Sequence, residues 1–515
     1  MKIITKIINS NNKTMKKIFA CLSILFSLFF LFLVYRAYVV NQPCKHQIKI
    51  VESASKFQIN NEILNRFKNS LKIQTVSYGQ NNQNFSALKD FISFIQTEFS
   101  DIEAYKYAKL DIINNYSLLY KIQGSDLALK PYLLAAHFDV VPADGQNDNW
   151  KFDPFSATTD EGFIYGRGTL DDKSSMLGQL EALRIFLKKN GQPRRTIYLA
   201  YGHDEEASGY QGAKSIAKFL GNTTLEFVLD EGTMIVEKVF KGLDTPLAYI
   251  GSTEKGYLTV KFFVNTTGGH SSMPNPEESA IFIVADAISK MKKNKHPSFL
   301  GYGPETTLLT RIATNLGFIK RVLLSNIWIF RPAIEFILSM NPTTDSLLRT
   351  TTAVTIVRSG VKENVLPSYA EFYVNHRIHS LQSCKEVLDY DLAVINDKRI
   401  NYEIIDCSEP IKTSSIESLG YSIIEHTTYQ IFPGVSAVPS IMIALTDSRF
   451  YTNLTENIYR YLPIRLLNED LKRYHGVDER ITTQGYEDMI NFYYLIFKNT
   501  DDAHLDKTRE LRNEL

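Results

Sequence analysis

Histidine and acidic residues cluster in five short motifs whose residue types suit metal-ion chemistry. Neutral imidazole nitrogens and carboxylate oxygens are the ligands of catalytic zinc. Acidic side chains that converge would repel one another unless a cation lay between them. The motifs are AAHFDVVP (His137, Asp139), YGRGTLDDKSS (Asp171, Asp172), YGHDEEASG (His203, Asp204, Glu205, Glu206), VLDEGT (Asp230, Glu231) and RYHGVDER (His475, Asp478, Glu479).

Each motif has an ordinary explanation when it is taken alone. A lone H-x-D is usually a surface pair, DEE a solvated acidic turn, DEG a turn closed by Gly232, and HGVDER an exposed helix start. The five motifs nevertheless follow one another in order, each at the end of an expected strand. Solvated surface does not explain that conjunction, so we interpret the motifs as parts of one metal site.

The elements that must position these motifs alternate between helix and strand from residue 63 to residue 253. Helical periodicity marks LNRFKNSLKIQ, SALKDFISFIQTEF and SMLGQLEALRIFLKKNG, and apolar runs mark the strands SLLYKIQG, YLLAAHFD, TIYLAYGHD and LEFVLDEG. This alternation predicts an α/β domain with a mainly parallel central sheet covered by helices on both faces. Active sites of such sheets lie beyond the carboxyl ends of the strands, where these motifs are expected.

Residues 255–410 instead predict a small α+β module. Within it, GYLTVKFFVNTT alternates polar and apolar residues, as an antiparallel strand with one solvated face does. The α/β pattern resumes after residue 410. We therefore expect a catalytic domain in two parts, 55–254 and 411–500, interrupted by this inserted module and followed by a polar tail over 501–515.

One stretch of the module, residues 318–340, is unusually apolar, although Lys320, Arg321 and Arg331 interrupt it too often for a membrane span. Its simplest interpretation is a helical hairpin buried against the module. The alternatives are a wall for an acyl chain or a surface that rests on a membrane.

The N-terminal region predicts targeting to the secretory pathway. Residues 1–17 precede an apolar segment at 18–40 that is long enough to cross a bilayer. Lys16 and Lys17 favour a signal anchor with a cytosolic N-terminus and a lumenal or extracellular body. The alternative is a cleaved signal peptide and a secreted body, especially if Met15 is the true start. Sequons compatible with a glycoprotein occur at Asn84, Asn115, Asn222, Asn265 and Asn453.

Composition excludes some classes of function. The chain has 515 residues and a formal net charge of +1, so no excess of positive charge predicts a nucleic-acid partner. Four cysteines are too few and too scattered for a disulfide framework, and Cys44, Cys384 and Cys407 lack the spacing of a cysteine-bound metal.

The order H-x-D, GRGxxDDK, DEE, DEG, GGHSS and a late HGxDER resembles the di-zinc aminoacylase and carboxypeptidase family. That family includes aminoacylase, carnosinase, glutamate carboxypeptidase and yeast carboxypeptidase S. The motifs are most similar to its secreted N-fatty-acyl-amino acid synthase/hydrolase branch and to its carboxypeptidase S branch. The resemblance covers nearly the whole chain after residue 55. It implies a zinc-exopeptidase-like catalytic domain in which the inserted module acts as a lid or dimerisation domain.

The resemblance also implies two zinc ions per chain. His137 and Asp230 would bind one ion, Glu206 and His475 would bind the other, and Asp171 would bridge both. A bridging carboxylate holds two ions about 3.5–4 Å apart, where they can clamp one water and one carbonyl oxygen.

Further roles follow from the same matches. Asp139 would orient His137 through a hydrogen bond, because residues i and i+2 of a strand point the same way. Glu205 would be the general base that takes a proton from zinc-bound water and passes it to the leaving nitrogen. His270 of GGHSS would stabilise the oxyanion, often from a partner subunit.

Candidate substrate-binding residues match the family less specifically. Arg449 suits bidentate capture of an α-carboxylate. Asn364, Gly434 and Arg377 match or lie near positions that hold the substrate. The sequence departs from the family at Ser174, where a glycine usually follows the Asp-Lys pair.

The function expected from these features is a di-zinc amidohydrolase that cleaves or forms the amide of N-acyl amino acids, with a fatty acyl group. A carboxypeptidase that releases C-terminal amino acids from peptides is the alternative. A third possibility, from another class, is an inactive membrane-anchored scaffold. Expected partners are the small N-acyl amino acid or peptide, a membrane through the N-terminal segment, and a second copy of the chain through the module.

Overall fold

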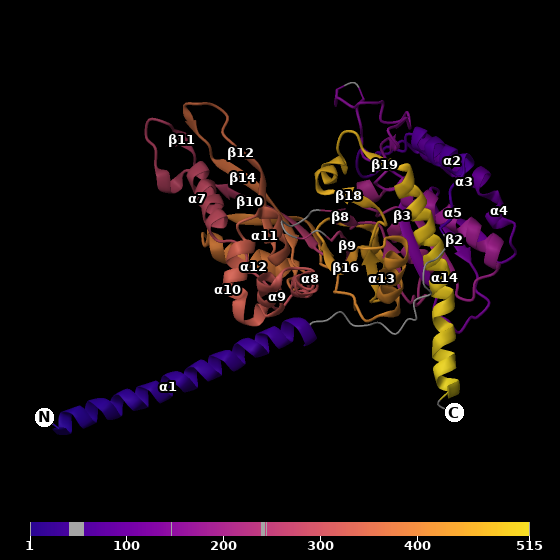
Figure 1. The fold of residues 1–515 in the computed structure, drawn as a ribbon. Helices are drawn as coiled ribbons and strands as arrows, with labels where there is room; N and C mark the ends of the chain where they lie inside the picture. Colours follow the sequence, from indigo (N-terminus) through magenta and orange to yellow (C-terminus); the bar gives the residue numbers. More distant parts are fainter. Residues whose placement is uncertain (1, 41–55, 146, 238–242, 244, 514–515) are drawn as a thin grey trace.

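The computed structural model describes residues 2–40, 56–145, 147–237, 243 and 245–513, so Cys44 lies outside the described residues. In these ranges ten strands form one mixed sheet in the order β1-β2-β6-β3-β7-β17-β9-β8-β18, with β16 paired to β9 (Figure 1). Its strands are β1 Ala108–Ile113, β2 Ser117–Ile122, β3 Tyr132–His137, β6 Ile197–Gly202, β7 Val228–Asp230, β8 Ile235–Glu237, β9 Leu247–Glu254, β16 Ser436–Met442, β17 Ile458–Arg460 and β18 Arg465–Leu467.

The centre of this sheet is parallel. β6, β3, β7 and β17 run in one direction, with Leu134 opposite both Leu199 and Leu229. Every residue of β3 and β6 is buried, as expected for strands that helices cover on both faces. Antiparallel pairs flank this centre, β1-β2-β6 on one side and β17-β9-β8 on the other. The predicted α/β fold is therefore confirmed, as a mixed sheet with a parallel centre.

Helices cover both faces of the sheet. α5 and α14 share one apolar core with Leu134 and Ala136 of β3, whereas α6 packs with Leu133 and Ala135 on the opposite face. This separation follows from the alternating side-chain direction along a strand. The helices of this part are α2 Asn61–Lys72, α3 Phe85–Glu98, α4 Ser100–Glu103, α5 Lys173–Asn190, α6 Ala213–Leu220, α13 Leu419–Ile431 and α14 Thr483–Asn513. The expected polar tail is thus helical as far as Asn513.

A second, antiparallel sheet of four strands has the order β12-β14-β10-β15. α7 and α12 pack on the buried side of β10 and β14, and β10 alternates buried and half-buried residues. Because these strands all lie between residues 256 and 408, we propose to retain the inserted module at 255–410. Its elements are β10 Gly256–Asn265, β11 Gly269–His270, α7 Ala280–Lys293, α8 Pro304–Ala313, α9 Phe318–Ser325, α10 Ile327–Leu338, α11 Pro342–Leu348, β12 Thr351–Ser359, β13 Val365–Leu366, β14 Tyr369–Ile378, α12 Cys384–Ile395 and β15 Asn401–Ser408.

Two features of the chain differ from simple sequence expectation. Cys384 and Cys407 form a disulfide between α12 and β15, although the spacing of the cysteines did not predict one. At the N-terminus, α1 Lys2–Tyr35 continues into a π-helical turn, Arg36–Val40. The helical segment Lys17–Val39 is apolar enough on average, and long enough, to cross a membrane.

Candidate metal centre

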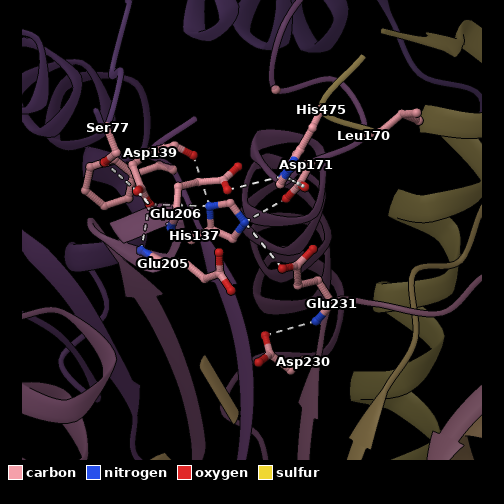
Figure 2. Close-up of polar contacts among 12 residues, drawn as sticks. Ser77, His137, Asp139, Leu170, Asp171, Glu205, Glu206, Asp230, Glu231 and His475 are labelled. Carbon is pink, nitrogen blue, oxygen red and sulfur yellow. Dashed lines mark hydrogen bonds and ion pairs between the residues drawn. The ribbon is translucent and has the colours of Figure 1, made fainter. Parts of the chain in front are cut away.

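The predicted motifs meet at the carboxyl edge of the parallel strands. His137 is the last residue of β3, and Gly202, which ends β6, lies opposite it in the register. Asp230 ends the neighbouring β7. Asp171 lies in the loop before α5, and His475 lies between a 3₁₀ turn, Asn468–Arg473, and strand β19 Arg480–Thr482. Figure 2 shows the side chains of His137, Asp171 and His475 close together.

Asp171 lies between the two histidines. Its Oδ1 is 2.9 Å from Nε2 of His137, and its Oδ2 is 3.0 Å from Nε2 of His475 (Figure 2). Each carboxylate oxygen thus faces a different imidazole. A carboxylate that binds two ions must present its oxygens in this way.

Each histidine has a further carboxylate beside it. Nε2 of His475 is 3.2 Å from Oε2 of Glu206, and Nε2 of His137 is 3.3 Å from Oε1 of Glu231. The side chains therefore form two groups of three. One group is His137, Glu231 and Asp171, and the other is His475, Glu206 and the same Asp171. His475 is exposed while His137 is buried, so the site opens to solvent on the side of His475.

Glu231, and not Asp230, occupies the position expected for the DEG ligand. The Asp230 carboxylate accepts a hydrogen bond from the backbone nitrogen of Glu231 at 2.9 Å (Figure 2). It accepts another from the backbone nitrogen of Ser448 at 2.8 Å. Adjacent residues at a strand end point in different directions, so only one of the pair can face His137. The sequence contains both carboxylates, but no signal in it separates them.

Asp139 acts differently from the expected side-chain orienter of His137. Nδ1 of His137 is 3.0 Å from the backbone carbonyl of Asp139 and 3.4 Å from its carboxylate. That carboxylate instead accepts hydrogen bonds from the backbone nitrogens of Glu205 and Glu206 and from the hydroxyl of Ser77. Asp139 therefore holds both the ring of His137 and the turn that carries Glu205.

Glu479 is a positioning residue for which the sequence analysis proposed no role. Its buried carboxylate accepts hydrogen bonds from the backbone nitrogens of Gly168 and Leu170, at 3.1 and 2.6 Å. Arg167 donates to the same carboxylate at 2.7 Å. The GRGTLDD loop is therefore tied to the HGVDER motif. The sequence did contain a signal for this role, because Glu479 lies in the same motif as the expected ligand His475.

The pKa shifts indicate that this cluster holds more negative charge than it neutralises. Burial and then the charge of Asp171 raise the pKa of Glu206 to about 7 and that of Glu231 to about 8. Hydrogen bonds to Asp171 and Glu206 raise the pKa of His475 to about 10. Burial also raises the pKa of Glu205 well above its usual value.

The donor set fits two divalent cations. Among the described residues, ligand atoms of His137, Asp171 and Glu206 lie within 4.8 Å of one another, close enough to hold an ion, as do those of His137, Asp172 and Glu231. Oε1 of Glu206 and both carboxylate oxygens of Asp172 are buried without a hydrogen-bond partner. Buried carboxylates without partners are costly, and cations would compensate them.

His270 and Asn364 lie together, but apart from this cluster. β11 pairs with β13, so His270 is opposite Val365, and the backbone nitrogen of Ser271 donates to the carbonyl of Asn364. His270 is exposed, and its Nδ1 is 2.7 Å from the hydroxyl of Ser272. None of the contacts among the described residues joins His270 to the metal cluster. Figure 1 places β11 at the outer end of the module.

Arg449 lies beside the DEE turn. Its Nη2 donates to the carbonyl of Ser208 at 2.6 Å, and it lines a cavity of about 370 Å³ together with Tyr210 and Phe450. Burial lowers the pKa of Arg377, and the charge of Arg449 acts in the same direction, so both arginines belong to one region. Gly434 has a φ of +82° and open space around it. No contact among the described residues joins Gly434 to the cluster.

Comparisons with known proteins identify relatives of the whole catalytic body. A sequence profile of peptidase family M20/M25/M40 matches residues 133–499. The N-fatty-acyl-amino acid synthase/hydrolase PM20D1.1 of Danio rerio is 42% identical over 452 residues, 87% of each chain. The probable carboxypeptidase S-like 2 of Dictyostelium discoideum is 42% identical over 449 residues, 85% of each chain.

Solved structures share the fold. The M20 family metallo-carboxypeptidase Sso-CP2 from Sulfolobus solfataricus superposes with a TM-score of 0.61 at 19% identity, over 85% of this chain and 99% of that one. The resemblance stated from the motifs is therefore confirmed.

Proposed function

The chain belongs to peptidase family M20/M25/M40, a family of metal-dependent hydrolases of amide and peptide bonds, and we propose that it is a di-zinc hydrolase/synthase of N-fatty-acyl amino acids. The observation that carries the hydrolase assignment is the placement of Asp171 between His137 and His475. The fatty acyl group is supported by the similarity to the Danio rerio N-fatty-acyl-amino acid synthase/hydrolase.

We assign the ligands from the geometry. His137, Asp171 and Glu231 would hold one ion, and His475, Asp171 and Glu206 the other. When bound, the ions would supply polarisation of the substrate carbonyl and activation of a water molecule. Nitrogen and oxygen donors with a carboxylate bridge suit zinc, as expected from the sequence.

The chain's own groups would move the proton and hold the substrate. Glu205 would accept a proton on its carboxylate and deliver it to the leaving nitrogen. Arg449 would bind the carboxylate of the amino acid, supported by its position beside the DEE turn. Arg377, Gly434 and Asn364 remain weaker candidates for substrate contact.

His270 would act across a homodimer. Its hairpin lies at the outer end of the module and makes no described contact with its own metal cluster. Dimerisation through the module would therefore bring His270 to the partner's site, where it would stabilise the oxyanion.

A carboxypeptidase of the carboxypeptidase S type is the second candidate, supported by the Dictyostelium relative. The two activities differ only in the acyl group, fatty chain or peptide. Purified full-length protein should be assayed with N-oleoyl-phenylalanine and with an N-blocked dipeptide. We expect faster turnover of the oleoyl substrate; a clear preference for the dipeptide would transfer the assignment to the carboxypeptidase.

Metal analysis distinguishes either enzymatic function from that of an inactive scaffold. We expect about two zinc ions per chain, following the two ligand groups. Under one ion per chain, together with no turnover of either substrate, would contradict the enzyme assignment.

The catalytic body would lie on the lumenal or extracellular side of a membrane, anchored by α1. The apolar span Lys17–Val39 and the Cys384–Cys407 disulfide support this location, because disulfides persist in oxidising compartments. N-terminal sequencing of the mature protein tests the anchor: a terminus beyond residue 40 would show that it is a cleaved signal peptide.

A further inference from the structure

The hairpin of α9 and α10 presents a large apolar surface to the outside of the module. We call this surface the α9–α10 face, defined by Phe318, Ile319, Trp328, Phe336, Ile337 and Met340. Its most exposed members, Ile319, Phe336 and Met340, are 72%, 70% and 73% exposed. The opposite side of the hairpin is buried, with Ile327 and Ile334 packed against Leu300 and Leu309. Large apolar side chains that gather in exposed positions on one hairpin indicate an interaction site.

The end of the N-terminal helix is attached to this same hairpin. The side-chain amide of Asn326, between α9 and α10, donates to the backbone carbonyl of Leu33 at 3.0 Å. Nε of Arg321 donates to the carbonyl of Ala37 at 3.1 Å. Leu33 and Ala37 are buried against Val322 of α9. Figure 1 shows α1 running away from this part of the module, so the hairpin lies at the base of the apolar helix.

Two aromatic contacts fix the position of the hairpin along the axis of α1. Tyr38 stacks on Phe318, with ring centroids 6.3 Å apart, and Phe29 meets Trp328 edge-on at 6.4 Å. At 1.5 Å rise per residue, Phe29 lies about 15 Å along the axis from Val39, the last residue of the span. The span of 23 residues slightly exceeds the length that a hydrocarbon core of about 30 Å requires. Trp328 is therefore beside a part of α1 that a bilayer would surround.

Two of the three basic residues that interrupt the apolar stretch, Arg321 and Arg331, have their charges held within the protein. The Arg321 guanidinium lies 4.0 Å from the centroid of the Tyr38 ring and also donates to the carbonyl of Thr314. The Arg331 guanidinium donates to the carbonyl of Ser298 and lies over the ring of Tyr302. Both charges are thus held by protein groups.

We propose that the α9–α10 face is inserted into the bilayer leaflet next to the catalytic body, as a second membrane-contacting element beside α1. An interfacial helix buries its apolar side roughly 5–10 Å into the leaflet, and the contact of Trp328 with Phe29 places this face at least that deep. The module is thereby held against the membrane, while β11 lies at its opposite end (Figure 1). A wall for an acyl chain would need the face to lie toward the metal cluster, whereas the aromatic contacts of Trp328 and Phe318 run to Phe29 and Tyr38.

The two tryptophans of the chain allow a direct test in the full-length protein. Trp150→Phe leaves Trp328 as the single emitter, and Trp328→Phe leaves Trp150, which is buried in the catalytic domain, as the matched control. Each variant is reconstituted into phosphatidylcholine vesicles with and without bromine on the acyl chains. We expect the Trp328 emission to fall by about half or more in brominated lipid, given the leaflet depth of an interfacial helix. The Trp150 emission should stay unchanged.

Two results would overturn the proposal. If aqueous acrylamide quenches Trp328 and brominated chains do not, Trp328 lies in water. If neither quencher reaches Trp328, and this shielding depends on the density of protein in the vesicles, a second copy of the chain covers it. Phe336→Glu combined with Ile337→Glu should reduce the lipid quenching of Trp328 while circular dichroism stays unchanged. Because fluorescence quenching does not depend on turnover, a negative result here would leave the proposed hydrolase activity untouched.

Discussion

The backbone nitrogen of Asp171 donates a hydrogen bond to Oε1 of Glu479, 3.2 Å away and 308 residues later in the chain. The loop that carries the bridging carboxylate is therefore held by the motif that supplies His475. The two motifs form one unit, although each belongs to a different part of the catalytic domain.

Glu479→Gln should weaken metal binding. The amide keeps an acceptor oxygen for the loop nitrogens but loses the charge that pairs with Arg167. Groups that orient metal ligands are typically worth about 10–100-fold in metal affinity or activity. Zinc titration against a competing chelator measures the change, with Glu469→Gln on the exposed surface as the control. Unchanged affinity would mean that the loop holds Asp171 without Glu479.

Glu231→Gln and Asp230→Asn distinguish the two carboxylates of the DEG motif. Glu231→Gln should lower the metal content toward one ion per chain, because its oxygen faces His137. Asp230→Asn should keep both ions, since an amide oxygen can still accept from Ser448. Metal content of both variants is measured by mass spectrometry. If Asp230→Asn loses an ion and Glu231→Gln keeps both, Asp230 is the ligand.

Glu205→Gln should retain the metal ions and lose turnover by roughly 10²–10⁴-fold, the usual contribution of a general base. The hydrogen bond from its backbone to Asp139 does not depend on the side chain, so the turn should stay in place. Metal content and kcat are measured on the same preparation. Near-normal kcat would require a different base.

Mixing two inactive variants tests whether His270 acts across a dimer. Co-expressed His270→Ala and Glu205→Gln chains would form a mixed dimer in which one site combines an intact Glu205 with the partner's intact His270. A symmetric dimer assembled at random should recover about a quarter of normal activity. If the mixture is as inactive as each variant alone, His270 does not act in trans.

Lys255 should make stability depend on pH. Burial lowers its pKa to about 7, and its ammonium group contacts the carbonyls of Ser346 and Arg349. Between pH 7 and the ordinary lysine pKa of 10.5, the unfolded state binds a proton that the native state does not. The free energy of unfolding should therefore rise with pH, by at most about 1.4 kcal/mol per pH unit. Chemical denaturation of wild type and Lys255→Met at pH 7 and pH 9 measures the difference; a parallel pH dependence in both would refute it.

Much of the architecture was predictable because it depends on local periodicity. The alternation of apolar runs and amphipathic segments predicts the helices and strands around the parallel centre of the sheet. His137 and Asp230 are the terminal residues of β3 and β7, as the patterns YLLAAHFD and LEFVLDEG indicated. The apolar length of residues 18–40 likewise predicts a helix, and α1 together with the π-helical turn Arg36–Val40 covers it.

The sequence by itself determined which residue types could meet at the strand ends, and therefore that the chemistry uses metal ions. Tertiary structure alone decided which atoms face one another: Glu231 instead of Asp230, the carbonyl of Asp139 instead of its carboxylate, and the attachment of α1 to α9 and α10. Such choices depend on side-chain direction and on contacts between residues far apart in the chain. Hydrophobic periodicity indicates which face of a helix or strand a residue occupies. It does not indicate which residue from a distant part of the chain contacts that face.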